Sequence, residues 1–366
     1  MKYYVIAGEA SGDLHGSRLI KAIKALDATS DFRAWGGDLI QAEGALLVKH
    51  YRDLAFMGFK EVAANLPAIM RNFTNCKKDI ESYSPDAIIF IDYPGFNMRM
   101  AKWARQKGFK TIYYISPQLW AWNASRAKKI KRDIDKMIVI LPFEEEFYKK
   151  YSYPVDYVGH PLVEAIEEFE LNKVEAKSDK KIITVLPGSR KQEISKMLPI
   201  MLKMVARFPA YEFKIAGAPG QNEAFYQPLL HGYNAELVFG RTYELLSKSF
   251  AAVVTSGTAT LETALFEVPE VVCYKGSPMS YRIGKWLVRV PYISLVNLIM
   301  NRQVVPELIQ DELTEDSLAS ELGKILVNES YRQEMMAGFR ELKEKLGGTG
   351  ASKRAAAIIH NFVSGA

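Results

Sequence analysis

The chain has 366 residues, 48% of them hydrophobic and 25% charged, and its formal net charge at pH 7 is +6. This composition is typical of a globular protein, excludes a disordered or low-complexity chain, and leaves room for two domains of ordinary size. The positive charge permits contact with phosphate or anionic lipid. The sequence lacks the finger spacing, recognition-helix pattern and aromatic–basic sheet pattern of nucleic-acid-binding modules, so we expect no nucleic-acid partner.

The cysteines and the apolar runs indicate a compartment. Cys76 and Cys273 lie far apart without metal-ligand spacing, which favours buried thiols in a reducing environment. The apolar run Tyr3–Ala7 is too short for the core of a signal peptide, and no run approaches the ~20 residues that span a bilayer. The five histidines also lack metal-ligand spacing, so we expect a cytoplasmic protein with no metal and no cofactor.

Short apolar runs alternate with helical periodicity along most of the chain. The runs are continuous, as expected for strands of a parallel sheet that is covered on both faces. The strands predicted in the first half are Tyr3–Ala7, Ala87–Ile91, Thr111–Ile115, Met137–Leu141 and Val155–Val158, with helices such as Leu14–Leu26 and Met98–Lys107 between them. Those of the second half are Ile182–Leu186, Phe213–Ala216, Leu237–Phe239, Ala251–Thr255 and Val271–Tyr274. This pattern predicts an α/β fold of two doubly wound, Rossmann-like units.

A change of composition after Gly159–Pro161 marks the boundary between the two units. A polar, acidic stretch leads from there to the charged segment Lys177–Lys181 before the next strand. We therefore expect an N-terminal domain at residues 1–163 and a C-terminal domain at residues 164–349. His160 is interpreted as a structural residue of the hinge. Ligands are expected at the carboxyl ends of the strands in each unit.

The first loop with a chemical pattern is Gly8–Asp13, between the first strand and its helix. Its small residues let backbone N–H groups approach a ligand at a helix N-terminus. Because Glu9 and Asp13 would repel phosphate, the hydroxyls of a sugar are the better match. The candidate contacts are Glu9, Ser11, Gly12 and Asp13. The alternative is a tight turn in which Ser11 or Asp13 caps the helix.

Asp92 directly follows the apolar strand Ala87–Ile91, at the edge where catalytic groups lie in such sheets. Pro94 and Gly95 then bend the chain sharply, which holds this edge residue in one orientation. The carboxylate is therefore a candidate general base. The alternative is that Asp92 caps the next helix, because Asp is common at N-caps.

Two loops of the second half match a diphosphate. After the strand Ile182–Leu186, Gly188 and Ser189 permit close backbone approach. Arg190 then offers a planar fork for phosphate, the alternative being an ordinary surface arginine. After the strand Ala251–Thr255, small residues lead into a helix N-terminus that suits a diphosphate, with a carboxylate one turn on for ribose hydroxyls. The residues of this loop are Ser256, Gly257, Thr258 and Glu262.

Two segments have the apolar face of a helix that docks on a membrane. Pro278–Pro291 has such a face between basic residues and contains no acid, which favours the membrane. Asn65–Phe73 repeats the spacing. The alternative for both is a helix that faces the protein core. The aromatic loop Tyr114–Trp122 before the basic segment Arg126–Arg132 fits either a wet–dry boundary or a packed domain edge.

Taken together, these loops resemble those of the lipid A disaccharide synthases. The similarity covers nearly the whole chain, and the order and spacing of the motifs carry it. The motifs are Gly8–Asp13, Ile91–Asn97, Tyr114–Trp122, Leu141–Glu144, Gly159–Pro161, Leu186–Arg190, Ser256–Glu262 and Ser294–Leu298.

The resemblance implies a GT-B fold and a glycosyltransferase of lipid A (endotoxin) biosynthesis. The implied reaction moves a diacylglucosamine from UDP-2,3-diacylglucosamine to the 6-hydroxyl of 2,3-diacylglucosamine 1-phosphate, with inversion, and gives a β-1,6 disaccharide and UDP. Asp92 matches the family's essential aspartate. Its UDP-binding residues are matched by Arg190, Glu262 and Asn297, and Gly8–Asp13 falls on the acceptor side. One carboxylate suffices as the base for an inverting transfer, and helix dipoles with an arginine can neutralise the leaving diphosphate without a metal.

The resemblance also bears on organisation and location. In GT-B proteins the final helix often packs on the first domain, which makes residues 350–366 a candidate for that helix. The implied location is cytoplasmic, with peripheral association to the inner leaflet of the inner membrane. Tyr93 and Gly95 depart from the family's pattern in the aspartate segment. The oligomeric state stays open, a homodimer included.

Two other classes of protein share part of these features. A sugar-nucleotide epimerase has the same fold and binds UDP, but acts on a water-soluble sugar. A non-catalytic adaptor for UDP-sugars or lipids would keep Arg190 and Glu262 without needing a carboxylate at the edge of the first sheet. Release of UDP from a mixture of donor and acceptor separates these alternatives.

Overall fold

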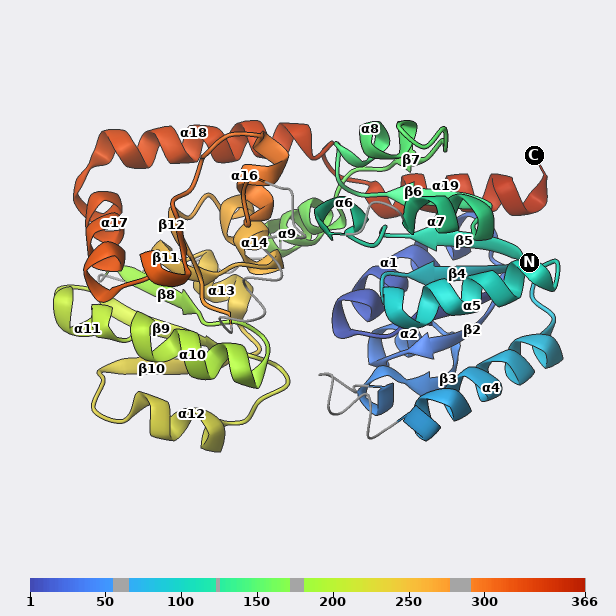
Figure 1. Ribbon diagram of the computed structural model, residues 1–366, viewed down its shortest axis with the longest axis horizontal. Coiled ribbons are helices and arrows are strands. Elements are labelled where there is room, and N and C mark those ends of the chain that lie inside the picture. Colours follow the sequence, from blue (N-terminus) through green and yellow to red (C-terminus); the bar gives the residue numbers. More distant parts are fainter. Residues whose placement is uncertain (55–65, 123–125, 172–180, 277–290, 366) are drawn as a thin grey trace. The chain divides into compact units, whose positions relative to one another are not determined.

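The computed structural model describes residues 1–54, 66–122, 126–171, 181–276 and 291–365 (Figure 1). The chain forms two compact units: Met1–Pro161 with Thr349–Ala366 is unit 1, and Leu162–Gly348 is unit 2. Each unit is built on one parallel sheet, which confirms the predicted α/β fold of two doubly wound units. No described helix is long and apolar enough to cross a lipid bilayer.

Within the described residues, the sheet of unit 1 has seven parallel strands, in the order β3-β2-β1-β4-β5-β6-β7. They are β1 (Lys2–Ala7), β2 (Asp31–Gly36), β3 (Leu46–His50), β4 (Ala87–Ile91), β5 (Lys110–Tyr114), β6 (Lys136–Val139) and β7 (Asp156–Tyr157). The chain starts in the middle of the sheet, builds it out to β3, and then crosses over to β4. The neighbours β1 and β4 therefore form the switch point, where doubly wound sheets bind ligands.

Helices cover both faces of this sheet. They are α1 (Ala10–Leu26), α2 (Asp38–Ala42), α4 (Leu66–Tyr83), α5 (Pro94–Gln106), α6 (Leu119–Trp122), α7 (Ala127–Asp133), α8 (Glu144–Lys149) and α19 (Ala351–Ser364), with a 3-10 turn at Tyr51–Leu54. Helices α4, α5 and α7 pack side by side, whereas α1 packs against α19.

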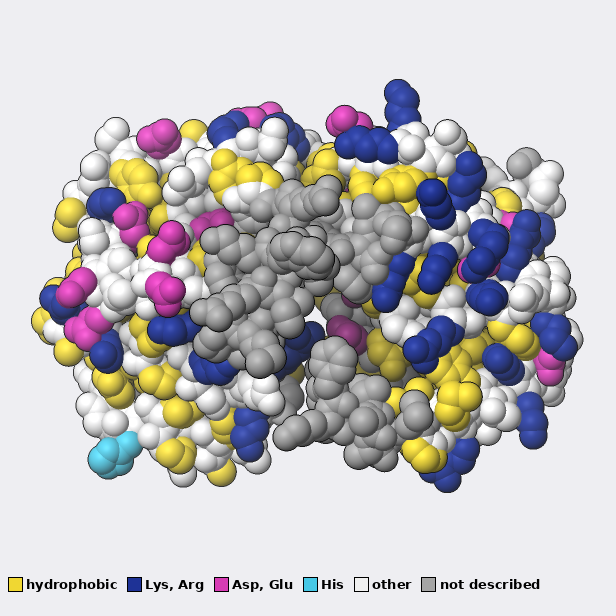
Figure 2. Space-filling view, viewed as in Figure 1, with side chains coloured by type: hydrophobic (Ala, Val, Ile, Leu, Met, Phe, Trp, Pro, Cys, Tyr) yellow, Lys and Arg dark blue, Asp and Glu magenta, His cyan; other side chains and the backbone are white. Residues whose placement is uncertain are grey.

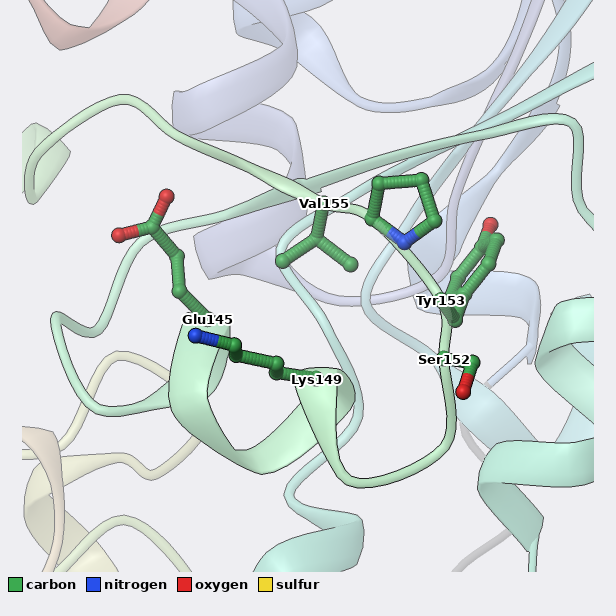
Figure 3. Close-up of a pocket in the computed structure, with 6 residues that line it drawn as sticks. Glu145, Lys149, Ser152, Tyr153 and Val155 are labelled. Carbon is green, nitrogen blue, oxygen red and sulfur yellow. The ribbon is translucent and has the colours of Figure 1, made fainter.

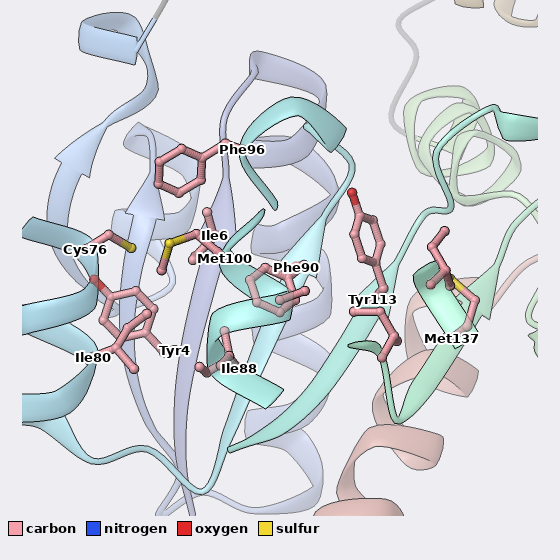
Figure 4. Packing of buried hydrophobic residues seen from close by; sticks show 14 of the residues in the cluster. Tyr4, Ile6, Cys76, Ile80, Ile88, Phe90, Phe96, Met100, Tyr113 and Met137 are labelled. Atoms are coloured by element: carbon pink, nitrogen blue, oxygen red, sulfur yellow. The ribbon is translucent and has the colours of Figure 1, made fainter. Parts of the chain in front are cut away.

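The core of unit 1 explains the apolar strands. On one face of the sheet, strand residues such as Tyr4 and Phe90 pack against Cys76 of α4 and Met100 of α5 (Figure 4). The next residue along β1, Val5, is also fully buried although it points to the opposite face. Burial on both faces is why the strands of this sheet have no polar alternation.

The helix α19 belongs to unit 1 although unit 2 precedes it in the chain. The Lys110 ammonium of β5 donates to the carbonyl oxygens of Phe362, at 3.3 Å, and Val363, at 2.9 Å. The Arg354 Nε donates to the carbonyl oxygen of Val158 at 2.9 Å. The Lys110 ammonium is favourable at the C-terminal end of α19 because the carbonyl end of a helix carries partial negative charge.

In the part of unit 2 that the structure describes, the sheet has six parallel strands, in the order β10-β9-β8-β11-β12-β13. They are β8 (Ile182–Leu186), β9 (Glu212–Gly217), β10 (Ala235–Phe239), β11 (Ser249–Thr255), β12 (Glu270–Tyr274) and β13 (Glu307–Ile309). The helices are α9 (Pro161–Leu171), α10 (Lys191–Met201), α11 (Lys203–Arg207), α12 (Glu223–Leu230), α13 (Thr242–Leu246), α14 (Thr258–Leu265), α16 (Leu295–Met300), α17 (Glu315–Val327) and α18 (Glu329–Lys345), with a 3-10 turn at Gln310–Glu312. Here the switch point lies between β8 and β11.

The two segments with a predicted membrane-docking face differ in how far they are described. Pro278–Pro291, except for its last residue, lies outside the described residues, as does Asn65. Most of the second segment forms the start of α4. There Phe73 is buried and stacks on Phe96 with ring centroids 4.3 Å apart, whereas Met70 is 55% exposed. Ile69 also packs against the core, so this face of α4 contacts the core at Ile69 and Phe73 and solvent at Met70.

Candidate active site

Asp92 is the first residue after the fully buried strand β4. Its φ is 44° and that of Tyr93 is 50°, so two consecutive non-glycine residues adopt the left-handed conformation. Tyr93, not Asp92, is the N-cap residue of α5, and the Tyr93 side chain makes no cap hydrogen bond among the described residues. The alternative that Asp92 caps this helix is therefore wrong.

The pKa of Asp92 is raised to about 6, first by burial and second by the negative charge of Glu9. The backbone N–H of Tyr93 lowers it in part. The loops after β1 and β4 also pack closely, because a Cβ on Gly8 would lie 2.3 Å from the Tyr93 ring. A carboxyl group with a pKa near neutrality can exchange a proton with a bound hydroxyl.

The Gly8–Asp13 loop contains one residue with a clear structural task. Helix α1 begins at Ala10 after Glu9, so neither Ser11 nor Asp13 is its N-cap. The buried carboxylate of Asp13 accepts hydrogen bonds from the backbone N–H groups of Gly37 (2.7 Å), Leu39 (3.1 Å) and Ile40 (3.1 Å). Asp13 thus fixes the start of α2, while Ser11 is exposed and Gly12 is buried.

In unit 2 the Gly188–Arg190 loop follows β8 at the switch point. Gly188 has a φ of 110°, and a Cβ there would lie 2.3 Å from the Glu193 carboxylate. That carboxylate accepts a hydrogen bond from the Ser189 N–H at 3.0 Å. Arg190, the N-cap residue of α10, is exposed and forms no ion pair within the described part of the chain. Its guanidinium is therefore available to an anion.

The Ser256–Glu262 loop follows β11, the strand beside β8. The Ser256 hydroxyl donates to the carbonyl oxygen of Ile293 at 2.9 Å, whereas Gly257 and Thr258 are exposed at the start of α14. Glu262 lies one turn further on and accepts a hydrogen bond from the Tyr243 hydroxyl at 3.3 Å. Burial raises the pKa of Glu262 to about 7, and the tyrosine opposes this shift.

Asn297 of α16 is fully buried, and its amide is engaged on both sides. Its Nδ2 donates to the Val305 carbonyl oxygen at 2.9 Å and to the Glu307 carboxylate at 2.8 Å. Its Oδ1 accepts from the backbone N–H groups of Val304 and Val305, at 2.7 and 3.0 Å. The structure therefore keeps this side chain inside unit 2, where it ties α16 to the segment that enters β13.

Other buried polar groups near the strand ends of unit 1 were not predicted as site residues. Glu144, the first residue of α8, accepts hydrogen bonds from the N–H groups of Leu141 and Ile140, and burial raises its pKa to about 7. Burial also lowers the pKa of His160 to about 3, which keeps that imidazole neutral. The sequence contains one signal for Glu144 as a site residue, because this acid closely follows the predicted strand Met137–Leu141.

A hollow of about 300 Å³ lies between α8 and the segment before β7, with Lys149, Tyr153 and Val155 among its lining residues (Figure 3). It includes none of the predicted site residues. Among the described residues, no group of three or more His, Cys, Asp and Glu side chains is placed to hold a metal ion.

Comparison with solved structures shows the fold. A UDP-GlcNAc 2-epimerase from Neisseria meningitidis bound to UDP-GlcNAc superposes with a TM-score of 0.68 at 13% identity, over 100% of both chains. The calicheamicin glycosyltransferase CalG4 gives a TM-score of 0.59 at 13% identity, over 99% of this chain and 98% of that one. Both an epimerase and a GT-B glycosyltransferase therefore share this architecture.

Comparison of sequences is more specific. Residues 3–361 match a family model described as Lipid-A-disaccharide synthetase. Lipid-A-disaccharide synthase from Geobacter metallireducens is 39% identical, over 97% of this chain and 95% of that protein. The enzyme of the same description from Coxiella burnetii (strain CbuG_Q212) is 36% identical over 98% of each chain. The chain thus belongs to the lipid-A-disaccharide synthases, the glycosyltransferases of lipid A biosynthesis.

Proposed function

We propose that the chain transfers diacylglucosamine from UDP-2,3-diacylglucosamine to the 6-hydroxyl of 2,3-diacylglucosamine 1-phosphate, with Asp92 as the general base. The observation that carries this proposal is the carboxyl group of Asp92, which follows β4 at the switch point of unit 1 and has a pKa of about 6. Membership of the family implies precursors of lipid A as substrates.

The chemistry is a single displacement. The 6-hydroxyl oxygen of the acceptor forms a bond to C1 of the donor sugar, its proton passes to Asp92, and the bond from C1 to the diphosphate breaks as UDP leaves. One displacement inverts C1, so one base suffices. An alcohol becomes acidic only as its new bond forms, and a positioned carboxylate therefore acts mainly on the transition state.

Unit 2 binds the UDP part of the donor in this proposal. The exposed guanidinium of Arg190 pairs with the diphosphate through two parallel hydrogen bonds. The Gly188–Ser189 and Ser256–Thr258 backbone groups approach the same phosphates, and the first turn of α14 adds its partial positive charge. Glu262 accepts hydrogen bonds from the ribose hydroxyls. Asn297 acts indirectly, because its four hydrogen bonds fix the segment between α16 and β13.

The acceptor lies against the Gly8–Asp13 loop in this proposal. Glu9 and the exposed Ser11 offer hydrogen bonds to sugar hydroxyls, and Gly12 keeps the loop close to the end of β1. Asp13 contributes by holding the start of α2 rather than by touching the sugar.

Unit 1 is also the part that meets the inner leaflet of the inner membrane, from the cytoplasmic side. It contains 26 Lys and Arg against 18 Asp and Glu, a formal charge of +8, whereas unit 2 has 22 against 24, a charge of −2. Figure 2 shows many of these basic side chains over the region of α5 and α7. Helix α5 has three basic residues and no acid. Each basic residue near an anionic surface contributes about 1 kcal/mol.

Sedimentation with anionic vesicles tests this surface. A triple serine variant of Lys102, Lys128 and Lys129 should bind less than wild type at low salt and equally at high salt. The matched control removes the same charge from unit 2 through serine at Lys324, Lys343 and Lys345. Equal losses in both variants would contradict the assignment of the membrane face to α5 and α7.

The decisive experiment for the reaction supplies both substrates. Incubation with UDP-diacylglucosamine and diacylglucosamine 1-phosphate should give UDP and a disaccharide 1-phosphate in equal amounts. UDP released without the acceptor, or conversion of UDP-GlcNAc alone to a second sugar nucleotide, would contradict the proposal. The latter outcome identifies an epimerase.

A further inference from the structure

The link between β4 and α5 is strained. Asp92 and Tyr93 have φ values of 44° and 50°, in a region that residues with a Cβ avoid because the side chain approaches the backbone carbonyl. Such conformations persist only where the surrounding structure enforces them, and they gather at functional sites. Other residues of unit 1 must therefore hold Asp92 and Tyr93 in this conformation.

The restraint acts on the backbone of Asp92. Its carbonyl oxygen accepts a hydrogen bond from the Tyr113 hydroxyl at 2.6 Å and another from the Asn97 Nδ2 at 2.8 Å. Its N–H donates to the carbonyl oxygen of Tyr114 at 3.2 Å. Tyr113 and Asn97 are both fully buried, and they come from different elements, β5 and α5. The peptide groups on both sides of Asp92 are thereby fixed.

The orientation of the Asn97 amide is fixed as well. Besides Asp92, its Nδ2 faces the carbonyl oxygens of Ile6 and Ile91, each at 3.2 Å, at the ends of β1 and β4. Only the nitrogen end of the amide can face three carbonyl groups. Its Oδ1 is then buried without a hydrogen-bond partner among the described residues. An unpaired buried acceptor is unfavourable for stability, so stability alone does not account for this side chain.

We infer that Asn97 and Tyr113 are positioning residues that hold Asp92 in its left-handed conformation and so aim its carboxylate at the acceptor hydroxyl. The inference rests on the proposed role of Asp92 as the base. If either donor is lost, Asp92 can relax toward the extended region, and this changes the direction of its Cα–Cβ bond. Displacement of a reacting group by about 1 Å can lower a rate about 100-fold.

The sharpest test is Tyr113→Phe, which removes one hydroxyl and keeps the ring. Its matched control is Tyr4→Phe, because Tyr4 is equally buried in the same sheet but donates to Asp79, at 2.7 Å. We expect similar falls in Tm for both variants. The kcat of Tyr113→Phe should fall about 10- to 100-fold with an unchanged KM for the donor, while Tyr4→Phe keeps the wild-type kcat. A wild-type kcat in folded Tyr113→Phe overturns the inference.

Two more variants separate this inference from the function on which it rests. In an Asp92→Asn background, Tyr113→Phe should cost no further activity, because both changes act through one carboxylate. Fully additive losses overturn the positioning role. Wild-type activity in the single variant Asp92→Asn would refute the role of Asp92 as the base. Loss of activity in Asp92→Asn together with wild-type activity in Tyr113→Phe would refute only the positioning role. Asn97→Ala should show the same loss of kcat at constant KM. A folded, fully active Asn97→Ala variant would contradict the positioning role of Asn97.

Discussion

Glu9→Gln removes one negative charge beside Asp92 while it keeps the size and most hydrogen-bonding capacity of the side chain. The pKa of Asp92 is raised from 3.8 to about 6, with burial as the first cause and Glu9 as the second. Because burial remains in the variant, only part of this rise should disappear. We expect the pKa of Asp92 in the variant to lie between 3.8 and about 6, and each full unit of that fall corresponds to about 1.4 kcal/mol.

The assay is the pH dependence of kcat/KM. A base works in its ionised form, so activity rises as the pH passes the pKa of Asp92 from below. A lower pKa therefore moves the acidic limb of the profile to lower pH. The height of the plateau near pH 8 reports separately on the hydrogen bonds of Glu9 to the acceptor.

The matched control is Glu146→Gln, which removes an exposed charge of α8 that does not contribute to the pKa of Asp92. Its profile should coincide with that of the wild type. An unmoved acidic limb in Glu9→Gln, or equal shifts in both variants, would refute the coupling between Glu9 and Asp92. A lower plateau in Glu9→Gln would reflect the lost contact of Glu9 with the acceptor and leaves the position of the acidic limb as the test of the coupling.

Four more changes have expected outcomes. Asp92→Asn should lower kcat by about 10²- to 10⁴-fold with little change in donor KM or Tm, and a near-wild-type rate would remove the base. Arg190→Lys should raise the donor KM in a folded protein, because a point charge cannot replace a bidentate fork; unchanged kinetics would take Arg190 out of the site. Asp13→Asn should destabilise by about 1–3 kcal/mol in denaturant titration, since one of its oxygens becomes an N–H group facing a backbone N–H donor; an unchanged midpoint would refute the role of Asp13 in fixing α2. Burial, aided by the charge of Glu307, raises the pKa of Glu270 well above its usual range, so folding binds a proton there and stability falls as the pH rises above about 4.5. Glu270→Gln should therefore have a higher Tm than the wild type at pH 8, and the two Tm values should converge toward pH 5. Parallel curves of Tm against pH would refute this.

The sequence predicts the strands near the middle of each sheet and misses others. The apolar runs at β4 and β8 coincide with the strands in the structure, because both faces of these strands are covered. Of the strands in the described ranges, three were not predicted: β2, β3 and β13. The first contains Asp31 and Arg33, and the other two lie at sheet edges, where one side of the strand meets solvent. Their pairing with a neighbour, rather than their composition, makes them strands.

The same limit applies to the candidate site. The sequence locates the loops after β1, β4, β8 and β11, because the carboxyl ends of parallel strands share one edge. It does not tell which polar side chains are already engaged inside the protein. Asp13 binds the N–H of Gly37, 24 residues away, and Asn97 binds the carbonyl of Ile6, 91 residues away. Such partners depend on tertiary packing that no local pattern encodes.

The return of α19 to unit 1 has a consequence for synthesis on the ribosome. The polypeptide emerges N-terminus first, and early segments fold as they appear. Helix α1 packs against α19, which follows more than 300 residues later. Until α19 has been made, the side of α1 that it covers stays open to solvent, and the Lys110 ammonium lacks the carbonyl groups of Phe362 and Val363. The residues of unit 2 are continuous from 162 to 348, so synthesis of unit 2 is complete before the last segment of unit 1 has been made. We therefore expect unit 2 to reach its final packing on the nascent chain before unit 1, although unit 1 begins the sequence.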